Sequence, residues 1–535
     1  MCLPNESETL HVTILETSDM HGSMLPINYA NNEHNEVGFA KIATLLRGLR
    51  KHAESEGELL LAIDNGDLIQ GTPLAYHHAR IDNAPGDPLV LALGRLGYDA
   101  AVIGNHEFNY GMNVLHKAVR ESKFPWLSAN IVKKGTKEPY FGQPYLIREF
   151  KGARIAVLGL TTPYIPNWEN PKHIEGLDFA DAVEAAARWV PYLRREERAD
   201  VVIVSYHGGF EKDPVTGEQS EVQTGENQGY RLCMEVPGID VLLTGHQHRE
   251  LAGIAVNGVT IVQPGHLGQK AGIVRLTLER DGGGWSVSEK SSELVPVIGV
   301  EPDSEVLELT EPYERATQLW LDTPIGSIEG DMTVRDPMQI RMKDNALIEF
   351  INKVQMETTG AAISNTALFT DDSPGFPPNV TMRHIVSNYI YPNTLKVIRI
   401  TGQDMRAALE KNAEYFKLGE DGRVGINPKY AVPKPQHYNY DMWEGIEYTL
   451  DISRPEGSRV VRLTYRGEPV DPGREYDVAM NNYRAGGGGD YTMFHGKPVI
   501  KDIPTDVSEL IANYILERKT VVASFDGNWE VVTGG

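Results

Sequence analysis

The sequence has little cysteine, no excess of basic residues and no long apolar run. Its only cysteines are Cys2 and Cys233, which excludes a framework of disulfide bonds. Lysine and arginine total 51 against 74 aspartates and glutamates, so the formal net charge is −23. Binding to a nucleic-acid polymer needs a basic face and is therefore not expected. No stretch approaches the roughly 18 apolar residues of a membrane-spanning helix, so no membrane span is expected.

The length and composition indicate a globular protein with several domains. At 535 residues the chain is longer than a single hydrophobic core usually supports. Hydrophobic residues make up 41% and charged residues 23%, which excludes a disordered or fibrous chain. The first residues lack the basic and apolar segments of a secretory signal, so we expect a cytoplasmic protein. If a leader has been removed, the alternative is an extracellular protein, or a lipid-anchored one that uses Cys2.

The first half of the chain alternates predicted strands with predicted helices. Six short apolar runs have the length and composition of buried strands. They are residues 11–15, 59–63, 100–103, 154–158, 201–204 and 241–243. Residues 37–49 and 179–194 have helical spacing and helix-forming residues. This alternation predicts sheets with covering helices, an α/β or α+β layered domain.

A second part of the chain begins after Val300. Residues 301–304 form a turn and helix-cap signal, which predicts a helix through Leu321 that Pro312 would kink or split. A new unit with its own strand and helix signals starts at Thr323. We therefore place a first domain at residues 1–300, a linker helix at 301–322 and a second domain at 323–535.

Polar side chains that can bind metal ions follow five of the predicted strands. They are Asp19 and His21, Asp67, Asn105, His207, and His246 and His248. Ligand sites in layered α/β folds form at the carboxyl ends of strands, so these loops can converge. Asp19 and His21 are two residues apart, as are His246 and His248, and extended backbone would point each pair the same way. The glycines at 66, 104 and 245 fit loops that turn sharply beside the ions.

These donors indicate a centre with two metal ions. Aspartate, asparagine and histidine without a thiolate suit manganese, zinc, iron or magnesium. Two metals about 3.5–4 Å apart are the arrangement that activates water against a phosphoryl group. Asp67 is the candidate for the bridging ligand, since a carboxylate can donate two oxygens. A single histidine after a strand is more often structural, but seven donors at five strand ends favour a metal centre.

Several motifs together resemble those of a known enzyme family. They are Asp19-Met20-His21-Gly22 and the stretches 64–71, 104–111, 245–248, 391–395 and 481–487. They resemble the calcineurin-like metallophosphoesterases, in the branch of 5′-nucleotidases and 2′,3′-cyclic-nucleotide 2′-phosphodiesterases, and the resemblance covers nearly the whole chain. It implies an N-terminal four-layer αββα metallophosphatase domain, a linker helix that serves as a pivot, and a C-terminal α/β 5′-nucleotidase-type domain that binds the nucleoside.

The resemblance also implies roles for individual residues. One ion would be held by Asp19, His21, Asp67 and His248, and the other by Asp67, Asn105, His207 and His246. His106 resembles the catalytic histidine, which stabilises the phosphoryl charge or protonates the leaving group while metal-bound hydroxide attacks. The family's base-stacking rings match Tyr440 and Tyr483, with Tyr438 as the next candidate. Asn482 and Arg484, which flank Tyr483 in the sequence, are the other candidates for substrate binding.

Two departures from the 5′-nucleotidase pattern bear on the substrate. The position three residues after His106 is Asn109 rather than aspartate, and an amide orients an imidazole without stabilising its cation. Residues 361–368 have neither the glycines nor the arginines that clamp a 5′-phosphate. Both favour a 2′,3′-cyclic-nucleotide 2′-phosphodiesterase and 3′-nucleotidase that takes a small nucleotide substrate. The alternatives are a 5′-nucleotidase or UDP-sugar hydrolase and, from another class, an inactive nucleotide-binding protein.

Overall fold

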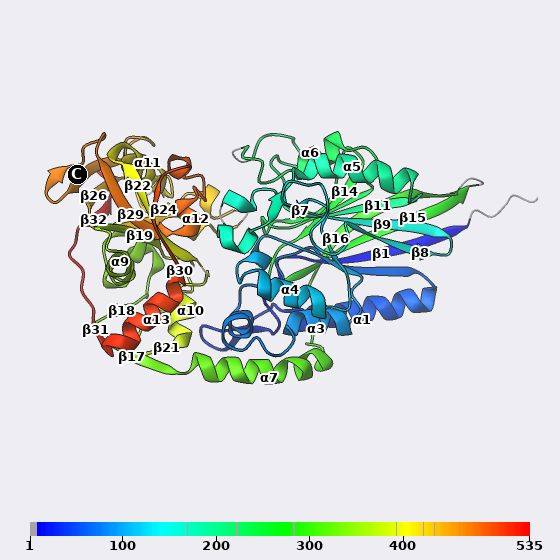
Figure 1. Ribbon diagram of the computed structural model, residues 1–535, viewed down its shortest axis with the longest axis horizontal. Helices are drawn as coiled ribbons and strands as arrows, with labels where there is room; N and C mark the ends of the chain where they lie inside the picture. The colour runs from blue at the N-terminus through cyan, green and yellow to red at the C-terminus, as the bar shows by residue number, and fades with distance from the viewer. Residues whose placement is uncertain are drawn as a thin grey trace, which may run out of the picture. The chain divides into compact units, whose positions relative to one another are not determined.

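The computed structural model describes residues 8–534 except 168, 221–222, 282–283, 392, 421 and 433. Cys2, the residue of the lipid-anchor alternative, and Pro392 lie outside the described residues. The chain divides into two compact units, whose elements are labelled in Figure 1. The first unit comprises Met1–Asn28, Asn32–Pro166 and Asn170–Thr317, and the second comprises Tyr29–Asn31, Asn167–Glu169 and Gln318–Gly535.

The first unit is built on two six-stranded sheets. One has the order β16-β15-β1-β4-β5-β6 and the other β13-β14-β12-β11-β9-β8. The strands of the first sheet are β1 (Thr9–Thr17), β4 (Leu59–Asp64), β5 (Ala100–Val102), β6 (Trp126–Leu127), β15 (Lys270–Asp281) and β16 (Gly284–Pro296). Those of the second are β8 (Tyr145–Phe150), β9 (Ala153–Thr161), β11 (Val201–His207), β12 (Val241–Thr244), β13 (Glu250–Val256) and β14 (Val259–Pro264).

The strands that precede the predicted metal ligands run parallel to one another within each sheet. Strand β4 pairs in parallel with β1 and with β5, and β12 pairs in parallel with β11. Parallel strands bring their carboxyl ends to the same edge of a sheet. The fold therefore places the loops after these strands together.

Helices cover the outer faces of both sheets, which gives the predicted four layers. Figure 1 shows α1 (Phe39–Glu56), α3 (Pro88–Arg95) and α4 (Met112–Glu121) on one side, and α5 (Ala182–Arg195) and α6 (Gly229–Glu235) on the other. Between the sheets lies a core of fully buried aliphatic side chains, including Ile14, Ile203 and Leu243. The αββα prediction for this unit is confirmed.

Most predicted elements are present with different ends. Helix α1 begins at Phe39 and continues seven residues past the predicted end, where Gly57 with a φ of 67° stops it. Helix α7 (Ser304–Leu321) agrees with the predicted linker helix. Pro312 lies inside α7 without splitting it, and Asp303 Oδ1 accepts a hydrogen bond from Val306 N at its start.

The second unit is also a mixture of sheets and helices. Its largest sheet has the order β25-β19-β29-β22-β30, and a four-stranded sheet has the order β28-β27-β26-β32. These strands are β19 (Ile363–Ala367), β22 (Thr394–Thr401), β25 (Asp441–Glu444), β26 (Glu447–Asp451), β27 (Val460–Tyr465), β28 (Glu468–Pro469), β29 (Glu475–Asn481), β30 (Val499–Asp506) and β32 (Trp529–Val532). The longer helices are α9 (Ala346–Thr359), α11 (Gly402–Ala413) and α13 (Val507–Arg518).

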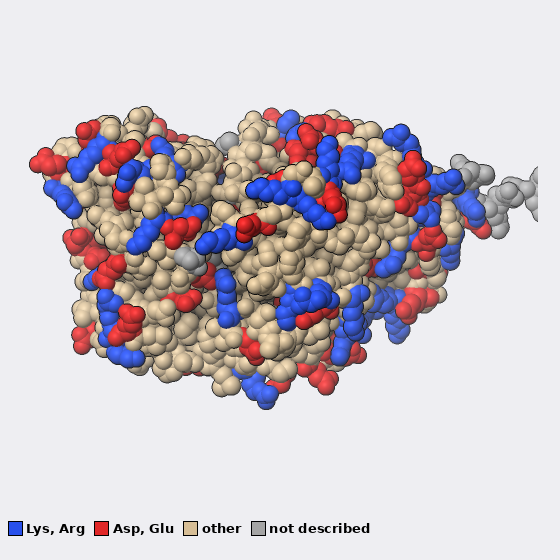
Figure 2. Space-filling model, viewed as in Figure 1, with Lys and Arg blue, Asp and Glu red and all other residues tan. Residues whose placement is uncertain are grey.

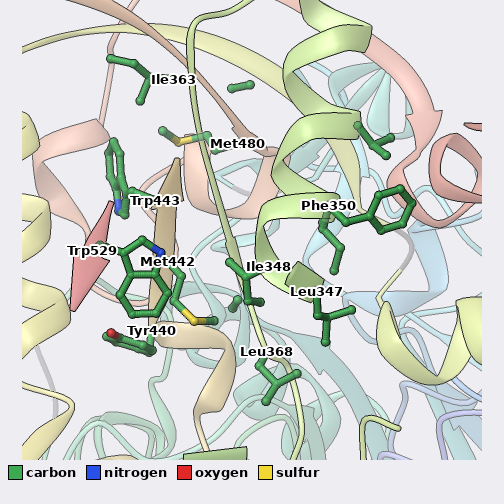
Figure 3. Packing of buried hydrophobic residues seen from close by; sticks show 14 of the residues in the cluster. Leu347, Ile348, Phe350, Ile363, Leu368, Tyr440, Met442, Trp443, Met480 and Trp529 are labelled. Atoms are coloured by element: carbon green, nitrogen blue, oxygen red, sulfur yellow. The ribbon is translucent and has the colours of Figure 1, made fainter. Parts of the chain in front are cut away.

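The core of the second unit is rich in aromatic side chains. Figure 3 shows Ile348 and Phe350 from α9 in the same cluster as Trp443 of β25 and Trp529 of β32. The ring of Trp529 stacks on Tyr448 with a centroid distance of 5.7 Å and an interplanar angle of 4°. This packing joins the last strand of the chain to the middle of the unit.

Among the described residues, no helix combines the length and the apolar character needed to cross a lipid bilayer.

Candidate metal centre

The seven predicted metal ligands gather in the first unit. Two groups of three have ligand atoms that all lie within 4.8 Å of one another. One group is Asp19, His21 and His248, and the other is Asp67, His207 and His246. Asn105 joins the second group, because its Oδ1 lies 3.1 Å from His207 Nε2 and 2.8 Å from His246 Nδ1. Loops from both sheets thus supply each group, while the bridging role of Asp67 stays a prediction.

Short distances between ligand atoms mark both groups. His248 Nε2 lies 3.3 Å from Asp19 Oδ1, and His207 Nε2 lies 3.1 Å from Asp67 Oδ2. Burial alone would raise the pKa of both carboxyl groups. The histidines outweigh it, so the pKa of Asp19 is lowered beside His248 and that of Asp67 lies well below its usual range beside His207. Both carboxylates are therefore charged and available to bind a cation.

The hydrogen bonds of two histidines determine which ring nitrogen faces the neighbouring ligand atoms. Carbonyl oxygens only accept, so His21 Nδ1, 3.2 Å from Gln70 O, and His207 Nδ1, 2.7 Å from Asn65 O, carry the hydrogens. In a neutral ring the Nε2 atom has the lone pair that can bind a cation. Burial disfavours a charge on His207, but the Asp67 carboxylate outweighs it and raises the pKa of His207 to about 10, so a bound cation would replace a proton there. His21 Nε2 faces His248 Nε2 at 3.1 Å, and His207 Nε2 faces only oxygen acceptors. Converging acceptors of this kind fit a bound cation.

The backbone at the ligands is strained. Five of the seven ligands have a positive φ, which L-residues with a side chain rarely adopt. They are Asp19 at 52°, His21 at 48°, Asp67 at 55°, His246 at 66° and His248 at 54°. Such strain persists where the surrounding structure holds it, and it concentrates at functional sites.

The expectation of extended backbone at the paired ligands is wrong. Asp19 and His21 reach the same group through left-handed kinks in the loop that follows β1. His246 and His248 do not point the same way, because they belong to different groups. The period-two rule of strands does not hold here, since both pairs lie beyond the strand ends.

The three glycines predicted beside the ions are required for two different reasons. Gly66 has a φ of 98°, and a Cβ there would also lie 2.7 Å from His207 Nδ1. At Gly104 a Cβ would lie 2.4 Å from Asp67 Oδ1, and at Gly245 it would lie 2.1 Å from Ser18 Oγ. Gly104 and Gly245 therefore allow close approach rather than an unusual φ.

Buried carboxyl groups behind the ligands hold their loops in place. Glu107 accepts hydrogen bonds from the backbone N–H groups of Asp67, Leu68 and Gly104 at 2.9, 2.6 and 2.7 Å. Burial and the nearby Asp67 raise the pKa of Glu107 to about 7, and burial raises that of Asp64 to about 8. Asp64 Oδ1 accepts a hydrogen bond from Gly66 N at 3.1 Å, so both carboxyl groups support the loops that carry the candidate ligands.

The predicted catalytic pair is in contact. His106 Nδ1 lies 2.6 Å from Asn109 Oδ1, so the ring donates its Nδ1 hydrogen to the amide oxygen. His106 N donates to Asp67 Oδ1 at 2.8 Å, and the His106 ring lies 5.2 Å from the His21 ring between centroids. The geometry therefore places an oriented imidazole beside the ligand groups.

One residue of the site, Glu226, was not predicted from the sequence. Its Oε1 lies 2.8 Å from His246 Nε2, so the ring donates Nε2–H to the carboxylate and turns its Nδ1 lone pair to the Asn105 side. Glu226 stands far from the ligand motifs and follows no strand, so no local pattern marks it.

The structure corrects two of the predicted nucleoside contacts in the second unit. Tyr440 is fully buried, stacks on Tyr415 at 5.0 Å, and donates its hydroxyl hydrogen to Arg341 O at 2.9 Å. Arg484 is also fully buried, where its Nε donates to Asp441 Oδ2 at 2.5 Å. Neither side chain is accessible to a base, because both complete the core under the neighbouring loop.

Tyr438 and Tyr483 are partly exposed and lie near each other. Their ring centroids are 6.2 Å apart with the planes at 76°. Tyr438 lies in a 3-10 turn (His437–Asn439). A Cβ at Gly488 would come within 2.6 Å of the Tyr483 ring, so the backbone of this loop covers one ring face. Asn482 Oδ1 accepts a hydrogen bond from Thr394 N at 3.0 Å, which is a structural contact.

Comparisons with known proteins agree with this two-part organisation. The Calcineurin-like phosphoesterase family model matches residues 12–250, and the model of the 5'-nucleotidase C-terminal domain matches residues 324–496. The 2',3'-cyclic-nucleotide 2'-phosphodiesterase/3'-nucleotidase of Salmonella typhimurium is 30% identical over 554 residues, which cover 90% of this chain and 82% of that protein. The calcineurin-like fold implies divalent metal ions, and the two ligand groups are the candidates to hold them.

Two further relatives extend the comparison. The crystal structure of a Staphylococcus aureus protein described as a 5'-nucleotidase has a TM-score of 0.86 and 34% identity, and the match covers 98% of this chain and all of that one. The Trifunctional nucleotide phosphoesterase protein YfkN of Bacillus subtilis is 28% identical over 98% of this chain. The chain spans only 39% of that longer protein.

Replacing Glu226 tests the contact that the sequence did not reveal. Glu226→Gln removes the charge that holds the His246 ring, and such outer-shell changes weaken metal binding about 10–100-fold. We expect one of two manganese ions per chain to be lost at lower chelator concentration, measured by elemental analysis after dialysis. Glu235→Gln, at a half-exposed position on α6, is the matched control and should leave both affinities unchanged. Equal affinities in the two variants would remove Glu226 from the site.

Proposed function

The chain belongs to the calcineurin-like phosphoesterases that carry a 5'-nucleotidase C-terminal domain, and on this basis we propose that it hydrolyses 2′,3′-cyclic nucleotides and 3′-nucleotides. The observation that carries the proposal is the pair of ligand groups with the oriented His106 beside them. When bound, two divalent ions lower the pKa of a water and polarise the phosphoryl group.

In this proposal the residues of the first unit divide the work between holding ions and moving a proton. Asp19, His21 and His248 would hold one ion, while His207, His246 and Asn105 would hold the other. Asp67 would bind both, because its carboxylate has two oxygens. His106 would direct Nε2 to the phosphoryl group and, as the imidazolium ion, give its Nε2 proton to the leaving oxygen, while Asn109 accepts the Nδ1 hydrogen and keeps the ring in that orientation.

The choice of substrate rests on residues 361–368, where the described structure provides no glycine or arginine to clamp a 5′-phosphate. Residues 363–367 form the fully buried strand β19. Arg341, which donates to Leu368 O just beyond this strand at 3.1 Å, is itself buried and pairs with Asp371 at 2.6 Å. Its guanidinium is therefore committed within the protein. This favours substrates whose phosphate is on the 2′ or 3′ oxygen.

We assign the nucleoside to the second unit, with Tyr483 and Tyr438 as the stacking rings. Stacking on an aromatic ring contributes about 1–3 kcal/mol per base without reading its identity, so broad base tolerance follows. A single nucleotide needs only a small binding site, whereas a nucleic-acid polymer needs an extended basic face. On the face drawn in Figure 2, lysine and arginine are interspersed with acidic side chains, which agrees with a small substrate rather than a nucleic-acid polymer.

A substrate panel tests the proposed function directly. Metal-stripped protein is reconstituted with manganese and given 2′,3′-cyclic AMP, 3′-AMP, 5′-AMP and a UDP-sugar at equal concentration. We expect the first two to be consumed and the others spared, as measured by chromatography of the products. Preferential hydrolysis of 5′-AMP or the UDP-sugar would establish the alternative enzyme, and no turnover with full metal content would establish a binding protein.

Replacing His106 separates proton transfer from metal binding. His106→Ala should lower kcat for 2′,3′-cyclic AMP about 10²–10⁴-fold, the usual contribution of a general acid or base. Metal content should stay near two ions per chain, whereas Asp67→Ala should lose metal. His52→Ala, at an exposed position, is the matched control. If His106→Ala retained full kcat, or lost the metals, its proposed role would be wrong.

Replacing Tyr483 tests the assignment of the nucleoside. Tyr483→Ala should raise KM for 3′-AMP about 5–150-fold with little change in kcat, because stacking contributes about 1–3 kcal/mol. Tyr483→Phe keeps the ring and should restore binding. Hydrolysis of 4-nitrophenyl phosphate, which has no base, should be the same in all three proteins. An equal loss on that substrate would show that Tyr483 acts on the fold and not on the nucleoside.

A further inference from the structure

A second group of acidic residues lies in the second unit and shares no residue with the metal centre. Asp344 and Glu349 stand at the start of α9, and Asp526 lies in the loop before β32. Each offers one carboxylate oxygen, and these oxygens all lie within 4.8 Å of one another. Glu444, the last residue of β25, adjoins the group through Asn528, whose Nδ2 donates to Glu444 Oε2 at 2.6 Å. Three segments that are distant in the sequence thus bring four carboxylates together.

The described residues offer these carboxylates little positive charge, and the effect of Lys353 on the pKa of Glu349 is smaller than the effects that raise it. None of the four forms an ion pair with a lysine, arginine or histidine among the residues that the structure describes. Asp344 is 4% exposed and Glu444 is 5% exposed, so water screens them poorly. Burial and the neighbouring Asp344 raise the pKa of Glu349 to about 7 and that of Glu444 to about 9. Burial and the neighbouring carboxyl groups therefore oppose the ionisation of Glu349 and Glu444, and a bound cation would favour their charged forms.

Backbone N–H groups of the loop before β32 donate to one oxygen of Asp344 and to one oxygen of Glu349, but other oxygens of this group have no hydrogen-bond partner. Gly527 N donates to Asp344 Oδ2 at 2.6 Å, and Asp526 N donates to Glu349 Oε2 at 2.8 Å. The buried atoms Asp344 Oδ1, Glu444 Oε1 and Asn528 Oδ1 accept no hydrogen bond. Buried polar atoms are nearly always paired, so three unpaired oxygens beside one carboxylate group indicate a missing positive partner.

We propose that these oxygens form a binding site for a divalent cation of calcium type. Calcium takes six to eight oxygen ligands in flexible geometry and uses carboxylates and amide carbonyls together. Asp344, Glu349 and Asp526 supply the central oxygens, and Glu444 and Asn528 supply those at the edge. The absence of nitrogen and sulfur donors separates this site from the histidine-rich centre of the first unit.

The ion would join the loop before the last strand to α9. Strand β32 pairs in parallel with β26, with Trp529 opposite Tyr448, and Trp529 packs in the aromatic core shown in Figure 3. Asp344 N also donates to Trp529 O at 3.1 Å. Neutralising the carboxylates at this junction would stabilise the docking of β32, which makes the site structural rather than catalytic.

Calcium binding to the full chain tests the proposal. The protein is loaded with manganese, and calcium is then measured by equilibrium dialysis and by the shift in Tm. We expect about one added calcium per chain and a rise in Tm of about 5–10 °C at 100 times Kd. Asp526→Asn and Glu349→Gln should abolish both, while Glu468→Gln, at an exposed position on β28, should behave as the wild type.

Two further readouts separate the site from a general effect of charge. Without calcium, Asp526→Asn should melt at or above the temperature of the wild type, because it removes a like charge, and calcium should reverse this order. Hydrolysis of 2′,3′-cyclic AMP should be unchanged in Asp526→Asn. No calcium bound by the wild type at millimolar concentration, or equal calcium responses in wild type and both variants, would overturn the proposal.

Discussion

The rest of the structure depends on one constraint, which is the close approach of metal-binding oxygen and nitrogen atoms in the first unit. Aspartate oxygens, an amide oxygen and imidazole lone pairs converge there within about the length of a hydrogen bond. Without a positive charge such groups repel one another, and five of the ligands also have left-handed backbone. The two sheets, their parallel strand ends and the close-approach glycines are arranged so that this unfavourable assembly is held ready for cations.

Hydrogen bonds from neighbouring residues set the tautomers and positions of the candidate ligands. Asn65 O and Gln70 O select the tautomers of His207 and His21, and Glu226 selects that of His246. Glu107 collects the N–H groups of two loops and so holds Asp67 in position. Asn109 orients His106 in the same way. A catalytic centre of this kind is a property of the whole network, because each donor has one useful orientation and a neighbour that enforces it.

The second unit contains two sets of aromatic side chains and a group of carboxyl groups. Its aromatic residues divide between a buried core, to which Tyr440 belongs, and the partly exposed rings of Tyr438 and Tyr483. The acidic group around Asp344 also brings carboxyl groups close together, as the metal centre does, but its candidate ligand atoms are all oxygens. In both units, carboxylates from distant segments lie close together, and a bound cation would stabilise them. The proposed consequence is catalysis in one unit and attachment of the last strand in the other.

The sequence by itself indicated the family and the layered fold and named seven candidate metal ligands, because these depend on short motifs that follow apolar strands. The resemblance also predicted the two groups, but the tertiary structure alone showed how the loops form them, since His246 and His248 diverge where the chain leaves the extended conformation. It also placed Tyr440 and Arg484 in the core, which the spacing of aromatic residues could not reveal. Glu226 and the acidic group around Asp344 depend on contacts between segments far apart in the chain, and no local pattern records such contacts.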